Sequence, residues 1–163
     1  MVSVLEIVVF ILFVGIGSTA LLDLWALMIS RVTRTPFMDW GLPGRWLLGM
    51  LKGNFVLRDG ISPATAGERT VGWVFHYLVG IGYAALLPLL ASWHYVLHPT
   101  FMPAFLVGFV LTSLAGLFIM VPGLGGGVCA LRTPSPLSVI QSLLISHVVF
   151  ALALYVLALV FVM

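Results

Sequence analysis

Asp23 is the side chain best placed for chemistry, because it stands inside a long apolar segment. That segment begins at Val4 and continues until Arg31, and about 20 apolar residues suffice to cross a bilayer. A carboxylate inside such a segment costs roughly 2.5–3.5 kcal/mol on insertion scales, and it normally faces a protein interior or a wet cavity. Asp23 therefore requires polar partners at membrane depth.

The other polar side chains expected at this depth lie in the same half of the membrane. At about 1.5 Å per residue, Asp23 lies roughly 10 Å, His76 roughly 8 Å and His147 roughly 15 Å from the basic ends of their segments. Gln141 is shallower than His147. We expect these side chains to wall a pocket open to the cytoplasm, with the glycine-rich stretch 122–127 at its mouth. The complete set of candidate pocket residues is Asp23, His76, Gln141, His147, Thr19 and Tyr77.

Three kinds of chemistry are open to these residues. Asp23 and His76 could form a hydrogen-bonded pair that only locks two helices together, or a pair that binds a ligand or exchanges a proton near neutral pH. Asp23, His76 and His147 have the residue types of a two-histidine, one-carboxylate metal site. A single ion, or a haem held by both histidines, would have to span their difference in depth. The sequence therefore does not identify a cofactor.

The composition is that of an integral membrane protein. Of the 163 residues, 62% are hydrophobic and 7% are charged, whereas a soluble domain has about 25% charged residues. The net charge is only +2, and no basic tract is dense enough to predict nucleic-acid binding. The single cysteine, Cys129, excludes an internal disulfide.

Four apolar segments supply the elements that position these side chains, at about 4–29, 71–91, 101–122 and 137–162. Continuous apolar runs of this length predict transmembrane helices rather than barrel strands. No Lys or Arg precedes the first run, so we expect it to be a retained span and not a secretory signal. The sequence thus predicts an all-α fold: one transmembrane domain over 1–163, built as a four-helix bundle.

The basic residues predict the orientation of these helices. All seven Lys and Arg side chains fall in the connections 30–70 and 123–136, and none falls at the two ends or in the connection 92–100. The positive-inside rule then places both long connections in the cytoplasm and both termini in the periplasm.

The connection 30–70 also contains a short helical pattern over 41–52. Pro43 fits its first turn, and Trp46, Leu47, Met50 and Leu51 share one face. We expect this helix to lie in the cytoplasmic headgroup layer.

Small residues recur every four positions in the first three spans, which predicts close helix contacts. The three ridges are Gly15, Thr19 and Asp23; Gly72, His76 and Gly80; and Gly108, Thr112 and Gly116. These ridges could pack within the chain, or against a second copy or another membrane protein.

Six short motifs follow one another along the chain. They are Asp23-Leu24-Trp25, Gly44-Arg45-Trp46, Gly67-Glu68-Arg69, Gly72-Trp73, His76-Tyr77 and Arg132-Thr133-Pro134. This order resembles an uncharacterised family of bacterial inner-membrane proteins of similar length, which have four predicted spans and a domain of unknown function. The resemblance implies an inner-membrane location and four helices, and it brings no activity to any residue.

Three functions follow as hypotheses. The first is a carrier or binding subunit whose pocket takes a small molecule, a lipid or a proton, with a carrier acting as a dimer. The second is a structural or accessory subunit of a larger membrane complex, and the third is a metal-dependent membrane enzyme. The chain is more consistent with a non-enzymatic role, and its one evident partner is the lipid bilayer.

Overall fold

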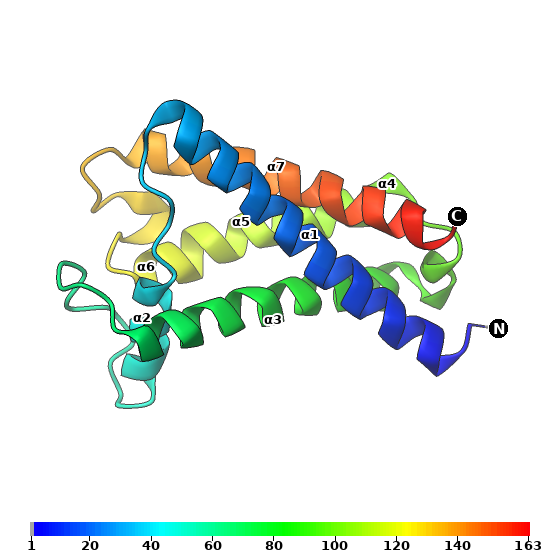
Figure 1. Ribbon diagram of the computed structural model, residues 1–163, viewed down its shortest axis with the longest axis horizontal. Helices are drawn as coiled ribbons and strands as arrows, with labels where there is room; N and C mark the ends of the chain where they lie inside the picture. The colour runs from blue at the N-terminus through cyan, green and yellow to red at the C-terminus, as the bar shows by residue number, and fades with distance from the viewer. Residues whose placement is uncertain (1) are drawn as a thin grey trace. The chain divides into compact units, whose positions relative to one another are not determined.

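The computed structural model describes residues 2–163, and over that range the chain is helical and has no strand. Its elements are α1 (Val4–Thr33), α2 (Gly41–Met50), α3 (Ala66–Ala91), η1 (Trp93–Val96), α4 (Phe101–Phe105), η2 (Leu106–Leu111), α5 (Thr112–Ala115), η3 (Gly116–Met120), α6 (Val121–Gly123), η4 (Val128–Ala130) and α7 (Pro136–Phe161). Figure 1 shows their course. The all-α prediction is confirmed, and so is the short helix in the first long connection, which is α2.

Four helices of the described chain are long and apolar enough to cross a membrane. They are α1, α3, the helix Phe101–Gly123 that runs from α4 to α6, and α7. Their bounds differ from the predicted ones by a few residues; α1, for example, continues to Thr33. The chain is therefore a multi-pass membrane protein.

The start of α1 is fixed by a capping box, which satisfies the first backbone N–H groups of the helix. The backbone N–H of Ser3 donates to Oε2 of Glu6 at 2.7 Å, and the backbone N–H of Glu6 donates to Oγ of Ser3 at 3.2 Å. At the other end, Arg34 has a positive φ of 56°, a conformation that commonly ends a helix.

The third span is not a uniform α-helix. The segments Leu106–Leu111 and Gly116–Met120 are π-helical, and such turns commonly bend helices. The helix ends at Gly123, within one residue of the predicted end of this span at 122. Two of the glycines that follow, Gly125 and Gly127, have φ of 89° and 74°, which side chains rarely adopt.

The chain divides into two compact units. Unit 1 comprises Met1–Pro36, Tyr77–Thr112 and Ile145–Met163, and unit 2 comprises Phe37–His76 and Ser113–Leu144. The prediction of a single domain stays a prediction.

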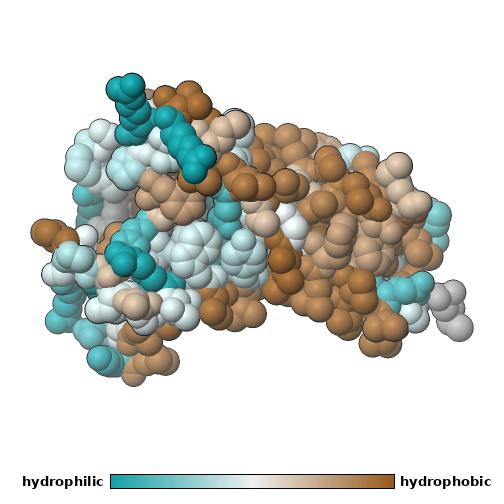
Figure 2. Space-filling view, viewed as in Figure 1, coloured by the Kyte–Doolittle hydropathy of each residue, from teal (hydrophilic) through white to brown (hydrophobic). Residues whose placement is uncertain are grey.

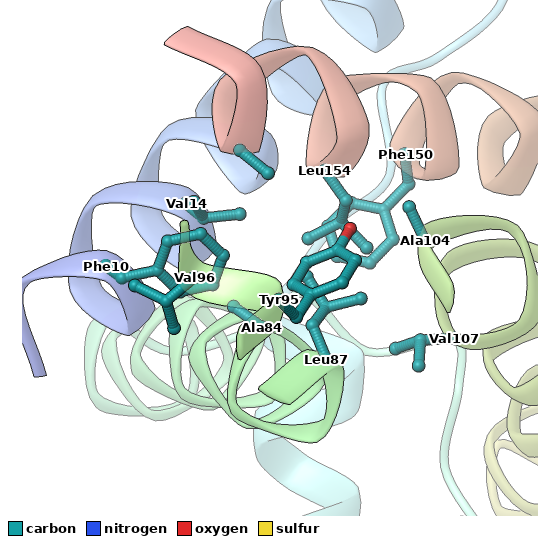
Figure 3. Packing of buried hydrophobic residues seen from close by; sticks show 11 residues of the cluster. Phe10, Val14, Ala84, Leu87, Tyr95, Val96, Ala104, Val107, Phe150 and Leu154 are labelled. Carbon is teal, nitrogen blue, oxygen red and sulfur yellow. The ribbon is translucent and has the colours of Figure 1, made fainter. Parts of the chain in front are cut away.

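Unit 1 has a buried apolar core contributed by α1, α3, η1, the third span and α7 (Figure 3). Phe10 lies at its centre, edge-on to the rings of Tyr95 and Phe161 at centroid distances of 6.2 and 5.2 Å. Burial raises the pKa of the Tyr95 hydroxyl to about 12, so this group is neutral at physiological pH. Within this unit, the N-terminus of α1 and the C-terminus of α7 lie on the same side of the unit as η1 (Figure 1).

Helices in unit 1 approach each other at glycines. A Cβ added to Gly15 of α1 would lie 2.6 Å from Cα of Ile81 in α3, and one added to Gly80 would collide with Oγ1 of Thr19. A Cβ on Gly108 would lie 2.6 Å from Cα of Ala151. These small residues therefore form contacts between helices of the same chain, which is one of the alternatives given for the small-residue ridges.

The surface of the long helices is apolar, as contact with lipid requires. In unit 1, for example, the exposed fractions of Leu24 and Leu78 are 62% and 60%. Figure 2 shows hydrophobic residues over much of unit 1, and hydrophilic residues over the loops of unit 2 and the C-terminal end of α1. Hydrophilic surface thus gathers at loops and helix ends, where the membrane does not have to be crossed.

Two glycines of α3 provide a matched test of the close helix contact. We expect Gly80→Ala to lower the free energy of unfolding by about 1–3 kcal/mol because the new methyl group collides with α1. Gly82 has open space around its Cα, so Gly82→Ala should be neutral or stabilising by about 0.4–1 kcal/mol. Thermal unfolding in detergent measures both, and equal effects would contradict the proposed contact.

Candidate functional site

Asp23 of α1 is bonded to Tyr77 of α3. The Tyr77 hydroxyl donates to Oδ2 of Asp23 at 3.0 Å, and both residues are half-buried. The intramembrane carboxylate therefore has a donor from a second helix, as its position required. Tyr77 directly follows His76 in α3, and the predicted pairing of Asp23 with His76 stays a prediction.

Thr19 has a structural role in the same unit. It is buried, its hydroxyl donates to the carbonyl oxygen of Gly15 at 2.8 Å, and it packs against Gly80. Thr19 stands one helical turn from Asp23. The tight crossing of α1 and α3 is therefore followed one turn later by the bond between Asp23 and Tyr77.

His76 is part of an aromatic cluster in unit 2. Its ring is stacked on Trp40 at a centroid distance of 3.8 Å and an interplanar angle of 23°, and it meets Trp73 edge-on at 5.9 Å. Trp73 in turn stacks on Phe37 at 6.2 Å. The sequence contained a signal for half of this cluster, because Trp73 and His76 are three residues apart on one helix, but Phe37 and Trp40 lie in a connection without periodicity.

The two remaining candidate residues lie on α7. Gln141 is exposed, whereas the prediction placed it in the wall of a pocket, and His147 is half-buried. Neither of two hollows on the surface, one of about 420 Å³ on unit 1 and one of about 180 Å³ on unit 2, is lined by any of the six candidate residues. The predicted pocket itself stays a prediction.

Within residues 2–163, no three His, Cys, Asp or Glu side chains form a group that could hold a metal ion. The metal site suggested by Asp23, His76 and His147 stays a prediction, because His76 belongs to unit 2 and the other two residues to unit 1. His94 and His98 have rings 4.3 Å apart, but a third ligand of these types is not grouped with them.

Arg45 of α2 forms a dense set of hydrogen bonds in unit 2. Its Nε and one terminal nitrogen donate to the two carboxylate oxygens of Glu68 at 2.9 and 3.1 Å. Its remaining donors bond the carbonyl oxygens of Asp59, Ser62 and Pro63 at 3.0, 3.0 and 2.9 Å. A guanidinium group has five N–H donors, so every donor of Arg45 is used.

The partners of Arg45 are held in place by bonds of their own. Glu68 forms a capping box with Thr65 at the start of α3, with donor–acceptor distances of 2.7 and 3.3 Å. The carboxylate of Asp59 accepts bonds from the backbone N–H groups of Ile61 and Ser62. These bonds to Ser62 and Ile61 lower the pKa of Asp59 to about 2, so the turn keeps its charge at physiological pH.

Trp46, the neighbour of Arg45, connects the loop after α2 to the end of the third span. Its indole N–H donates to the carbonyl oxygen of Phe55 at 2.9 Å, and its ring covers Gly123, where a Cβ would collide with it. The backbone N–H of Leu57 donates to the carbonyl oxygen of Gly123 at 2.7 Å. Gly123, the first glycine of the glycine-rich stretch, is therefore covered by this loop.

The crossing of α2 and α3 explains two further motif residues. A Cβ on Gly44 would collide with the carbonyl group of Glu68, and one on Gly72 would collide with the carbonyl group of Trp40. Only glycine allows the two backbones to come this close.

A family model described as "Protein of unknown function (DUF2938)" matches residues 12–161. The chain belongs to this family. The resemblance inferred from the six motifs is thereby confirmed at the level of an uncharacterised family. No curated protein and no solved structure matches the chain.

In this DUF2938 protein, five of the motif residues are explained by packing and bonding. Gly44, Arg45, Trp46, Glu68 and Gly72 all connect α2 to its surroundings in unit 2. Asp23 differs from these five, because its carboxylate lies in a span.

The saturated guanidinium group of Arg45 predicts that lysine cannot replace it. A lysine has three donors on one nitrogen and cannot bond Glu68 through two nitrogens and three carbonyl oxygens together. We expect Arg45→Lys and Arg45→Ala to expose the loop 53–63, and a protease in solution to cut it several-fold faster than in the wild type.

Lys52→Ala is the control, because Lys52 is exposed on the same connection and no described bond of the loop depends on its side chain. Loop cleavage that is as slow in Arg45→Lys as in Lys52→Ala would show that the bonds of Arg45 do not hold the loop.

Proposed function

We propose that this DUF2938 protein lies in the bacterial inner membrane with both termini in the periplasm. The support is the placement of charge. Arg31 lies in the last turn of α1 and Arg34 directly follows that helix. The remaining basic residues lie on α2, in the connection that follows it, at the start of α3 and in the connection before α7. Lys and Arg in short loops favour the cytoplasmic side.

Cysteine labelling in intact cells tests this orientation. In a Cys129→Ser background, we expect His98→Cys to react with a membrane-impermeant maleimide and Lys52→Cys to react only after lysis. Both positions are exposed, so lysed cells provide the positive control. Labelling of Lys52→Cys in intact cells would reverse the orientation.

We propose further that Asp23 and Tyr77 form a proton-binding site used by a small carrier or binding subunit. The single observation behind this proposal is the bond of 3.0 Å between the Tyr77 hydroxyl and the Asp23 carboxylate within the membrane-spanning helices. A tyrosine hydroxyl can donate to a carboxylate and can accept from a carboxylic acid. The pair can therefore stay bonded when Asp23 takes up a proton and when it releases one.

The energies favour this role over a purely structural one. Hydrogen bonds between transmembrane helices contribute about 0.6 kcal/mol on average and at most about 1.7 kcal/mol. A carboxylate at the centre of a span costs roughly 2.5–3.5 kcal/mol, and Asp23 lies about 15 Å from the end of α1 at Thr33. A neutral Ser or Thr would bond Tyr77 at a lower insertion cost, so an acidic residue at this position is better explained by its ability to titrate.

His147 is half-buried on α7 within the same unit as Asp23 and Tyr77. In the proposed scheme His147 belongs to the proton site, and Thr19 is its structural support. Four spans are few for one carrier, so we propose that a carrier acts as a dimer.

The second candidate is a helix lock in an accessory subunit of a larger membrane complex. The observation in its favour is the position of the bond one turn from the contact of Thr19 with Gly80. A lock and a proton site make different predictions for the same variants.

Proton flux into liposomes, followed by an enclosed pH-sensitive dye, separates the two candidates. We expect the wild type to carry protons, Asp23→Asn to lower the flux by at least about tenfold, which corresponds to 1.4 kcal/mol, and Tyr77→Phe to lower it less. Glu6→Gln is the matched control, since Glu6 is an exposed carboxylate on the same helix. Its flux should equal that of the wild type.

Thermal unfolding of the same variants completes the design. Flux that is lost while Asp23→Asn stays folded supports the proton site. Wild-type flux no greater than that of protein-free liposomes overturns it, and a lowered unfolding temperature in Asp23→Asn and Tyr77→Phe would then support the helix lock.

A further inference from the structure

An open groove on unit 1 lies between α1 and α7, on the face of α1 that does not carry Asp23. Its volume is about 420 Å³. The residues that line it are apolar: Leu21, Leu24, Trp25, Met28, Val149, Leu152, Ala153 and Val156. The groove belongs to neither the proposed proton site nor the bonds around Arg45.

The groove is a shallow channel with small residues at the bottom and large ones at the rim. Ala153 is 6% exposed and forms its floor, whereas Leu24 and Val156 are 62% and 49% exposed. All of its lining belongs to membrane-spanning helices, so the groove opens toward lipid. A flexible hydrocarbon chain fits such a lining, and a polar ligand would leave its own polar groups unbonded.

A basic residue, Arg31, lies beyond the end of the groove that is nearest the C-terminus of α1. Arg31 follows Leu24 by seven residues and Met28 by three, so it shares their face of the helix, about 4.5 Å further along the axis than Met28. Its side chain is exposed. Arg34 follows three residues later and is also exposed.

The segment that carries these two arginines is held by its own hydrogen bonds. The Ser30 hydroxyl donates to the carbonyl oxygen of Thr35 at 2.6 Å, and the Thr33 hydroxyl donates to that of Ile29 at 2.7 Å. The backbone from the last turn of α1 to Thr35 therefore has a defined course, which places the Cα atoms of both arginines near this end of the groove.

We propose that the groove binds one acyl chain of an anionic phospholipid, whose phosphate is bound by Arg31 with Arg34 nearby. The apolar lining selects a hydrocarbon chain, and the charge at its end selects an anionic headgroup over a zwitterionic one. Basic side chains beside transmembrane helices recognise lipid headgroups in this way. The proposal uses the orientation of α1 in the membrane and does not depend on the role of Asp23.

Native mass spectrometry of protein extracted from vesicles with equal amounts of phosphatidylglycerol and phosphatidylethanolamine tests this proposal. We expect the wild type to retain one phosphatidylglycerol in preference to phosphatidylethanolamine. Arg31→Gln should reduce that preference about fivefold, which is the contribution of one basic side chain near an anionic surface. Arg58→Gln is the matched control, because Arg58 is exposed on unit 2 and should leave the preference unchanged.

A second variant tests the groove without changing charge. Ala153→Leu fills the floor and should reduce retention of the lipid, while Arg31 stays in place. Equal retention of the two lipids by the wild type, or an Arg31→Gln protein that behaves as the wild type does, would overturn the proposal. If Ala153→Leu does not fold, the comparison of Arg31→Gln with Arg58→Gln still decides the question.

Discussion

The close approach of helix backbones at glycine is the constraint on which most of this structure depends. Lipid tails are as apolar as leucine, so helices in a bilayer are held together by packing and hydrogen bonds rather than by exclusion of water. Both units use the same solution. In unit 1 the α3 backbone near Ile81 lies against Gly15, and in unit 2 the Glu68 carbonyl lies against Gly44. Larger side chains at these positions would separate the helices and remove the contacts that hold them.

The glycine contacts also decide which polar bonds can form. Because Thr19 of α1 packs against Gly80 of α3, the helices are still close one turn later, where Asp23 meets the hydroxyl of Tyr77. In the same way, the crossing of α2 and α3 at Gly44 brings Arg45 within reach of Glu68. In both units, a bond of a charged side chain thus lies within one helical turn of a close glycine contact.

The sequence predicted the spans and α2 because both depend on local patterns. Apolar length defines a span, and helical spacing with a proline at the first turn defined α2. The bonds of Arg45 were not predicted, since they join residues 14 to 23 positions apart through a loop without periodicity. The stacking of His76 on Trp40 was missed for the same reason, and the two π-helical segments leave no periodic signal.

The predicted polar site shows a different limit of sequence reasoning. Counting residues along a helix gives the depth of Asp23, His76 and His147, but it does not give the direction in which each side chain points. In unit 1, Asp23 accepts a bond from Tyr77, which was not predicted as its donor, and the pairing of Asp23 with His76 stays a prediction. Successive residues of a helix are about 100° apart, so depth alone could not distinguish between them.

The two faces of α1 give the helix two separate environments. Leu21, Leu24 and Met28 line the open groove, while Asp23 lies about 200° around the axis from Leu21 and is bonded to α3. One helix thus keeps its only membrane-depth carboxylate away from lipid and presents an apolar channel to it. A proton taken up at Asp23 would neutralise a charge on the interior face, while the face toward lipid would stay unchanged. Separation of the two faces by the width of a helix is what allows a site that changes charge to exist in a chain with so little polar surface.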